Sequence, residues 1–259
     1  MRVALALPLA MFACGGSSPP PEPPAPVVSP TPVTRQIIED DSEPEEGVTI
    51  INARGRMDPA VVEAGIAPHK EALSACYTEN LARRRWLGGQ VVLWWDINKE
   101  GTVTGVHLHE TEPGTSLGNW QIEKCILDVA RQATFGKPIG GDADFQIPLE
   151  FTARGRVINW DDDQALRAVG GQTSTIDECV HPKKPPKKPL PKAERPVAPK
   201  GPVTITLYVG PGGKAQSVGF AGKPVIDDAW AECAVKAAMA WRLPDPKGIV
   251  AKLAIQYPR

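Results

Sequence analysis

The chain has 259 residues and a formal net charge of −1 at pH 7, because 29 lysines and arginines face 30 aspartates and glutamates. This balance excludes a uniformly basic chain of the kind that binds nucleic acid along its surface. The 28 prolines and 24 glycines predict long segments without regular structure beside globular ones. Four histidines and three tyrosines are few for acid–base or metal chemistry. We therefore expect a protein that is not an enzyme and has no cofactor and no metal site.

The N-terminal residues 1–14, "MRVALALPLAMFAC", are typical of a secretory signal, with one arginine before a short apolar run. That run is too short to span a bilayer. The residues around Cys14 resemble a bacterial lipobox, which implies lipidation of Cys14 and attachment to a membrane through this lipid. Gly15 resembles the residue that follows the cysteine in outer-membrane lipoproteins, so we expect the periplasmic side of the outer membrane. The alternative is ordinary cleavage with Cys14 incidental.

Composition divides the remaining chain into one linker and two domains. Residues 15–57 are rich in proline and then in acidic residues, which predicts a linker. A first domain is expected over 58–152 and a second over 153–259, with a lysine- and proline-rich insertion at 181–201. The insertion is favoured as a soluble loop, although its charge suits anionic lipid or cell-wall polymer as well.

An internal repeat sets the predicted fold. Residues 90–108, "QVVLWWDINKEGTVTGVHL", align without gaps on residues 202–220, "PVTITLYVGPGGKAQSVGF". Apolar residues alternate on both sides of a glycine-containing turn, which predicts a β-hairpin in each copy. The matched inward positions are Val91, Leu93, Trp95 and Ile97 in the first copy, and Val203, Ile205, Leu207 and Val209 in the second.

The repeat continues on both sides of the hairpin. Upstream, residues 58–76 and 161–179 each begin with a helix-capping aspartate and end with a cysteine. Downstream, each copy has an amphipathic helix and then a last alternating strand, at 145–151 and 251–257. The predicted fold class is α+β, with two tandem domains of one three-stranded antiparallel sheet, two helices on one face and one disulfide.

The four cysteines after Cys14 are distributed two to each domain. One is near the end of the first helix and one lies in the second helix, so we expect the pairs Cys76–Cys125 and Cys179–Cys233 in an oxidising compartment. Neither the spacing of a zinc site nor that of a redox-active cysteine pair is present. The disulfides are therefore predicted to stabilise sheets too small for a large core.

A family resemblance follows from these residues. The stretch from "ALSACYTEN" through "KCILDVARQATFGKP" to "FQIPLEF" resembles the AgmX/PglI C-terminal domain, a TonB C-terminal-like module of myxobacterial-type envelope proteins. The resemblance covers residues 58–152 and includes Cys76-Tyr77, Cys125 and Phe135 with Pro138; the second copy is similar more weakly. It implies a non-enzymatic module, in some members connected with gliding motility, that receives an extended partner segment at the last strand.

Such strand addition requires unpaired backbone groups at a sheet edge. Pro148 interrupts the last strand of the first copy, whereas residues 249–257 contain no internal proline. The second copy is therefore predicted to be the more receptive edge. The partner-binding residues expected there are Ala251, Leu253, Ile255 and Tyr257. The alternative is that this edge pairs with the other repeat inside the same chain.

A second candidate surface combines Trp94, His107 and His109, which strand alternation places on one face. An outward tryptophan is unusual unless a partner covers it. Two histidines at i and i+2 also suit a metal, but no third ligand accompanies them. The sequence thus predicts an adaptor or scaffold of envelope proteins. The alternatives are a metal-dependent envelope enzyme that uses this face and a peptidoglycan-binding lipoprotein.

Overall fold

The computed structural model describes residues 54–110, 112, 114–183, 191, 195–223 and 225–257. The predicted signal, Cys14 and nearly all of the 15–57 linker lie outside these residues, as does part of the 181–201 insertion. None of the helices in this described part is long and apolar enough to cross a membrane. The two halves described below are residues 54–152 and 153–257.

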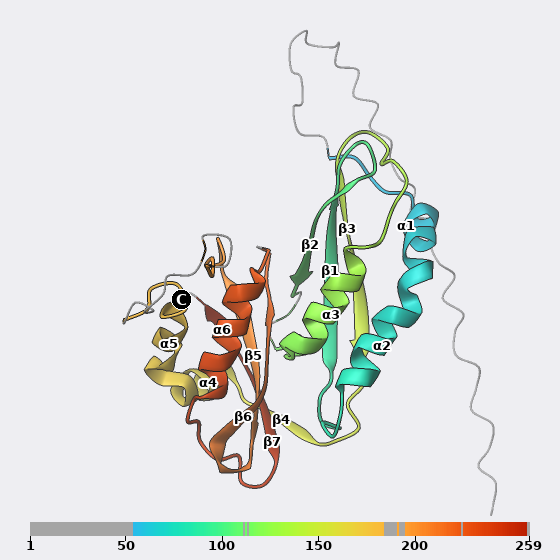
Figure 1. Cartoon of the computed structure of the whole chain (residues 1–259). Coiled ribbons are helices and arrows are strands. Elements are labelled where there is room, and N and C mark those ends of the chain that lie inside the picture. Colours follow the sequence, from blue (N-terminus) through green and yellow to red (C-terminus); the bar gives the residue numbers. More distant parts are fainter. Residues whose placement is uncertain are drawn as a thin grey trace, which may run out of the picture. The chain divides into compact units, whose positions relative to one another are not determined.

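The first half contains one antiparallel sheet with strand order β2-β1-β3. The helix predicted over 58–76 is broken at Ala67–His69 into a 3₁₀ turn, which contains Pro68 and separates two α-helices. Figure 1 shows α2 and α3 lying beside each other over the first sheet. The elements are α1 (Pro59–Ile66), α2 (Lys70–Asn80), β1 (Gly89–Ile97), β2 (Val103–His109), α3 (Trp120–Ala130) and β3 (Ala143–Phe151).

The second half repeats this element order but adds a strand. Its sheet has four strands in the order β4-β7-β5-β6, so the prediction of a three-stranded second sheet is wrong. The extra strand β4 pairs parallel with the start of β7, and its apolar Val157-Ile158 pair lies in the connection between the halves. The elements are β4 (Val157–Asn159), α4 (Asp162–Val169), α5 (Ser174–Asp177), β5 (Val203–Gly210), β6 (Lys214–Ala221), α6 (Asp228–Met239) and β7 (Val250–Tyr257).

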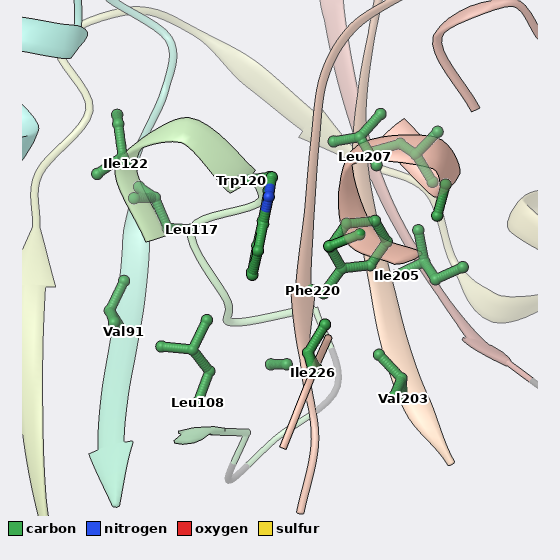
Figure 2. Close-up of a cluster of buried hydrophobic side chains, with 14 of the residues drawn as sticks. Val91, Leu108, Leu117, Trp120, Ile122, Val203, Ile205, Leu207, Phe220 and Ile226 are labelled. Carbon is green, nitrogen blue, oxygen red and sulfur yellow. The ribbon is translucent and has the colours of Figure 1, made fainter. Parts of the chain in front are cut away.

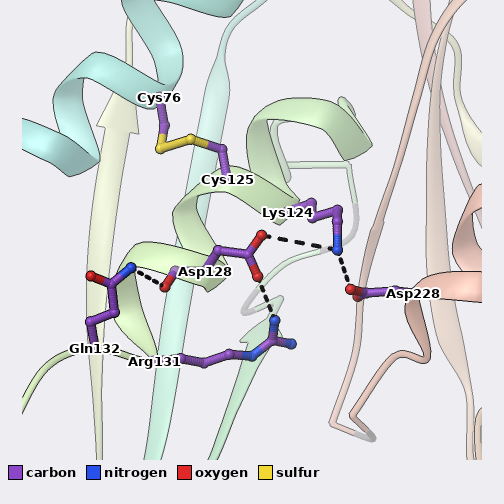
Figure 3. A network of polar contacts seen from close by, with 7 residues as sticks. All are labelled: Cys76, Lys124, Cys125, Asp128, Arg131, Gln132 and Asp228. Atoms are coloured by element: carbon purple, nitrogen blue, oxygen red, sulfur yellow. Dashed lines mark hydrogen bonds and ion pairs between the residues drawn. A yellow bond between two sulfur atoms is a disulfide. The ribbon is translucent and has the colours of Figure 1, made fainter.

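Both predicted disulfides are present. Cys76 of α2 is bonded to Cys125 of α3, and Cys179 is bonded to Cys233 of α6, with Cα–Cα distances of 5.6 and 5.8 Å. The first disulfide lies next to Lys124, which forms an ion pair with Asp228 of the second half (Figure 3). Each disulfide therefore lies within one half, while the Lys124–Asp228 ion pair connects the two halves.

Buried apolar side chains of both halves form one continuous cluster. Inward residues of β1 and β5 pack beneath their helices, as the alternation predicts. Trp120 of α3 meets Phe220 of β6 edge to face, with ring centroids 5.7 Å apart (Figure 2). The two predicted domains therefore share a core and pack on one another.

Candidate peptide-binding edges and the tryptophan–histidine face

The outer edge of β3 is the first candidate edge for strand addition. Among the described residues, no strand pairs with β3 on the side opposite β1. Just before the strand, the N–H of Gly55 donates to the carbonyl of Asp142 at 2.7 Å, so Asp142 directs its backbone outward. Since backbone direction alternates along a strand, Asp144, Gln146 and Pro148 direct theirs outward as well.

Pro148 therefore occupies a position where its missing N–H removes no bond to β1. Asp144 and Gln146, which precede Pro148, both keep their outward N–H and C=O groups. The sequence-based argument that proline makes this edge unreceptive does not apply to these two outward residues before it.

A groove of about 600 Å³ runs between α1 and this edge. We call it the α1–β3 groove. Its apolar lining comes from the helix side and from the two residues that flank Gln146, while charged residues stand at its rim. The lining residues are Gly55, Arg56, Met57, Pro59, Val62, Glu63, Ile66, Lys70, Asp144, Phe145, Gln146 and Ile147. An apolar groove beside unpaired backbone groups is the arrangement that strand addition requires.

The edge of β7 is partly occupied, which corrects the prediction that residues 249–257 form an open edge. Strand β4 pairs with Val250–Lys252, and the N–H of Trp160 donates to the carbonyl of Lys252 at 2.9 Å. The predicted partner residue Ala251 is therefore opposite Ile158 of the same chain. This pairing is within the second half, so the alternative drawn from the sequence, pairing with the other repeat, is not what the structure shows over these three residues.

Beyond Lys252 the outer side of β7 has no strand partner in the described part of the chain. A smaller groove of about 330 Å³ lies there, lined by Asp162, Leu166, Thr204, Ala254, Ile255 and Gln256. The side chains of Leu253 and Ile255 are buried in the core. The hydroxyl of Tyr257 bonds to Asp177 at 2.5 Å. The outward carbonyl of Lys252 means that alternation directs the backbones of Leu253, Ile255 and Tyr257 toward β5. These three predicted partner residues therefore present neither free side chains nor outward backbone groups at this edge, which corrects the prediction.

The structure brings together the three residues predicted for the second surface. The Trp94 ring is stacked on His107 at 5.8 Å and meets His109 edge-on at 5.4 Å. They line a cavity of about 340 Å³ with Arg54, Asp96, Asp144 and Lys223. Asp96 thus lies on the same face as the three predicted residues.

His107 is the more buried histidine of this face, and only 9 % of it is exposed. Burial lowers the pKa of His107. The carboxylate of Asp96, 3.9 Å away, opposes this decrease, and the nearby His109 adds to it. The imidazole of His107 is therefore neutral near pH 7. No group of three histidine, cysteine, aspartate or glutamate side chains that could hold a metal ion occurs among the described residues.

A buried polar contact between the halves escaped the sequence reasoning. Glu123 of α3 is 1 % exposed, and its carboxylate accepts the N–H groups of Gly118, Asn119 and Phe220 at 2.8, 3.0 and 2.9 Å. A Cβ atom at Gly219 would lie 2.3 Å from this carboxylate, so only glycine fits there. The sequence did contain a sign of this burial. Glu123 is spaced i+3 from Trp120 and i+7 separates Trp120 from Leu127, which places the glutamate on the apolar face of its helix.

The interface continues around this carboxylate. Ser217 donates to the Gly118 carbonyl at 2.6 Å and accepts from Asn119 at 2.8 Å. The hydroxyl of Tyr208 donates to the Gly88 carbonyl at 2.5 Å. Polar side chains of β5 and β6 thus form hydrogen bonds with loop groups of the first half, and these bonds fix how the two sheets pack on each other.

No protein-family model, no curated protein and no solved structure matches this chain.

Proposed function

We propose that this chain is a non-catalytic adaptor that binds an extended segment of an envelope protein by adding it as a strand to β3. The observation that carries this proposal is the outer edge of β3, to which no strand of the described residues is paired, with the outward backbone groups of Asp144 and Gln146 beside the α1–β3 groove. Main-chain hydrogen bonds would supply affinity, and the groove would select side chains.

The groove defines the kind of segment that fits. Alternate residues of an added strand point to the same face, so apolar residues at every second position would contact Val62, Ile66 and Phe145. Arg56 lies at the rim and forms no ion pair with any described residue. An acidic residue at one end of the segment would pair with it.

Three further features support an adaptor in the cell envelope. Two disulfides are stable outside the reducing cytosol. The lipobox-like sequence at Cys14 favours a lipid anchor on the periplasmic side of the outer membrane. The resemblance to the AgmX/PglI C-terminal domain favours two tandem TonB-like modules and a role in a motility or transport complex.

The proposal is tested by a crosslinker placed in the groove. A photoreactive residue at Val62 is introduced into the full chain in its native envelope, and crosslinked partners are identified by mass spectrometry. Gln146→Pro removes one outward N–H and should abolish the crosslink, whereas Gln146→Ala keeps that N–H and should preserve it. Pro148 shows that β3 accepts proline at an outward position.

A partner that crosslinks equally to both variants would contradict strand addition at β3. The register of the two sheets makes Ala254 of β7 the equivalent of Gln146, since Leu149 and Tyr257 lie opposite the matched residues Val91 and Val203. Ala254→Pro therefore asks the same question of the second edge. Thermal unfolding of each variant establishes that the loss of a crosslink is not loss of the fold.

A further inference from the structure

Two connections that are far apart in the sequence meet at one end of the first sheet. The α2–β1 loop and the segment after β3 are joined where the carbonyl of Arg85 accepts the N–H groups of Arg154 and Gly155 at 2.7 and 2.8 Å. A Cβ atom at Gly155 would lie 3.1 Å from the backbone nitrogen of Trp86. The two backbones are therefore in direct contact (Figure 1).

This contact gathers an arginine cluster, which consists of Arg83, Arg84, Arg85, Arg154 and Arg156. All but Arg84 are exposed. Arg84 donates to the carbonyl of Asn80 at 3.2 Å, a bond that leaves its charge uncompensated. No carboxylate of the described residues lies within ion-pair distance of any of the five.

The cluster differs in this respect from three other arginines of the described residues. Arg54, Arg131 and Arg167 each have a carboxylate partner on a described residue. The chain as a whole carries a net charge of −1, so the cluster is a local concentration and not the consequence of a basic composition. Like charges held together repel one another, and this repulsion is relieved when an anion binds.

Side-chain contacts anchor the backbone that carries the cluster. The hydroxyl of Tyr77 donates to the carbonyl of Leu87 at 2.9 Å, and the Trp86 ring packs on Tyr208 with centroids 4.8 Å apart. Arg154 is close enough to Tyr77 that its charge lowers the pKa of the phenol, against a larger increase caused by burial. The arginines therefore project from a fixed platform, which reduces the entropic cost of binding.

We propose that the arginine cluster binds the phosphate groups of anionic lipids at a membrane surface. Guanidinium groups bind phosphate oxygens through paired hydrogen bonds. Half-buried Trp86 stands among them, and tryptophan favours the boundary between lipid and water. A membrane is chosen over a soluble polyanion because the lipobox-like sequence at Cys14 would hold the chain beside one.

The inference is independent of strand addition, because the cluster and the α1–β3 groove share no residue. Its test is co-sedimentation of the full chain, with Cys14→Ser, on vesicles of phosphatidylcholine alone or with phosphatidylglycerol. The variant carries Arg83→Gln, Arg85→Gln, Arg154→Gln and Arg156→Gln. It should bind the anionic vesicles at least about tenfold more weakly than the parent, and 0.5 M salt should weaken the parent similarly.

The matched control removes the same charge from ion-paired positions: Lys70→Gln, Lys99→Gln, Arg131→Gln and Arg167→Gln. It should bind as the parent does. Equal binding of the parent to both vesicles, or equal losses in both variants, would overturn the proposal. Binding to soluble heparin without binding to vesicles would overturn the choice of a membrane. If the arginine variant unfolds, Arg83→Gln and Arg156→Gln tested singly should each give a smaller loss, and no loss in either contradicts the proposal.

Discussion

The carboxylate of Glu123 accepts the backbone N–H of Phe220 at 2.9 Å, 97 residues away in the sequence. This bond joins α3 of the first half to β6 of the second at a site sealed from solvent. The same carboxylate holds the N–H groups of Gly118 and Asn119 at the start of its own helix. One side chain thus closes a loop, caps a helix region and docks the two halves.

Glu123→Ala should lower the free energy of unfolding by about 3 kcal/mol, because it leaves three buried N–H groups without an acceptor. Urea unfolding of the disulfide-intact protein measures this difference. Glu79→Ala serves as the control, since Glu79 is exposed on α2 and should change stability by less than about 0.5 kcal/mol. Equal effects of the two substitutions would show that the interface does not depend on Glu123.

The free energy of unfolding should fall as the pH rises from about 5 to about 7.5, because Glu123 ionises in this range. Burial raises its pKa from 4.5 to about 7, against three backbone hydrogen bonds and Lys252, which lower it. A pKa that is higher in the folded state stabilises the fold below the unfolded value, and this contribution is lost as the pH passes the folded value.

Two other groups with shifted pKa values do not cause this decline, because their effect on stability has the opposite sign or falls in another pH range. Burial lowers the pKa of Lys252 to about 8. The charged lysine therefore destabilises the fold by a constant amount below that pH and adds no pH dependence there. The lowered pKa of His107 makes the fold less stable on acidification, which is the opposite trend. Glu123→Gln should therefore remove the decline between pH 5 and 7.5, and a decline that persists in this variant would contradict the assignment.

Two buried tryptophans should differ in their response to phenylalanine. Both Trp95 and Trp230 are fully buried, but the indole N–H of Trp95 donates to the carbonyl of Ala130 at 3.1 Å. The indole N–H of Trp230 has no partner among the described residues. Trp95→Phe should therefore cost about 1–2 kcal/mol more than Trp230→Phe in chemical unfolding, and a reversed order would refute the bonding difference.

Neighbouring glycines in the β5–β6 turn allow backbone strain to be separated from a collision. Gly212 and Gly213 have φ angles of +74° and +67°. A Cβ atom at Gly213 would lie 1.8 Å from the carbonyl oxygen of Leu243, whereas at Gly212 it would meet nothing within 4 Å. Gly212→Ala should cost about 1–2 kcal/mol from its φ alone, and Gly213→Ala clearly more. Similar melting temperatures for the two variants would contradict this.

Removal of the Cys76–Cys125 disulfide by a double alanine substitution should lower stability by up to about 4 kcal/mol, since it opens a loop with a sequence separation of 49 residues. Calorimetry with and without reductant measures the effect. Reductant should destabilise the parent more than the double variant, which keeps one disulfide. Peptide mapping without reductant that finds bridges between the halves would exclude the pairing.

The sequence by itself determined the local order of elements and both disulfides. Alternation of period two identified β1, β2, β5 and β6, because side-chain direction in a strand depends on the neighbouring residues alone. The position of one cysteine in or just beyond each helical region restricted pairing to helices packed side by side. The Trp94–His107–His109 face also followed from alternation across one hairpin.

Only the tertiary structure decided what depends on contacts between distant segments. Strand β4 is three residues long, so its pairing with β7 carried no recognisable pattern, and the edge expected to be open was partly filled. The α1–β3 groove, the arginine cluster and the seat of Glu123 likewise arise where chain segments meet that lie far apart in the sequence. Their geometry is set by how two sheets dock, a property of packed surfaces that no single segment encodes.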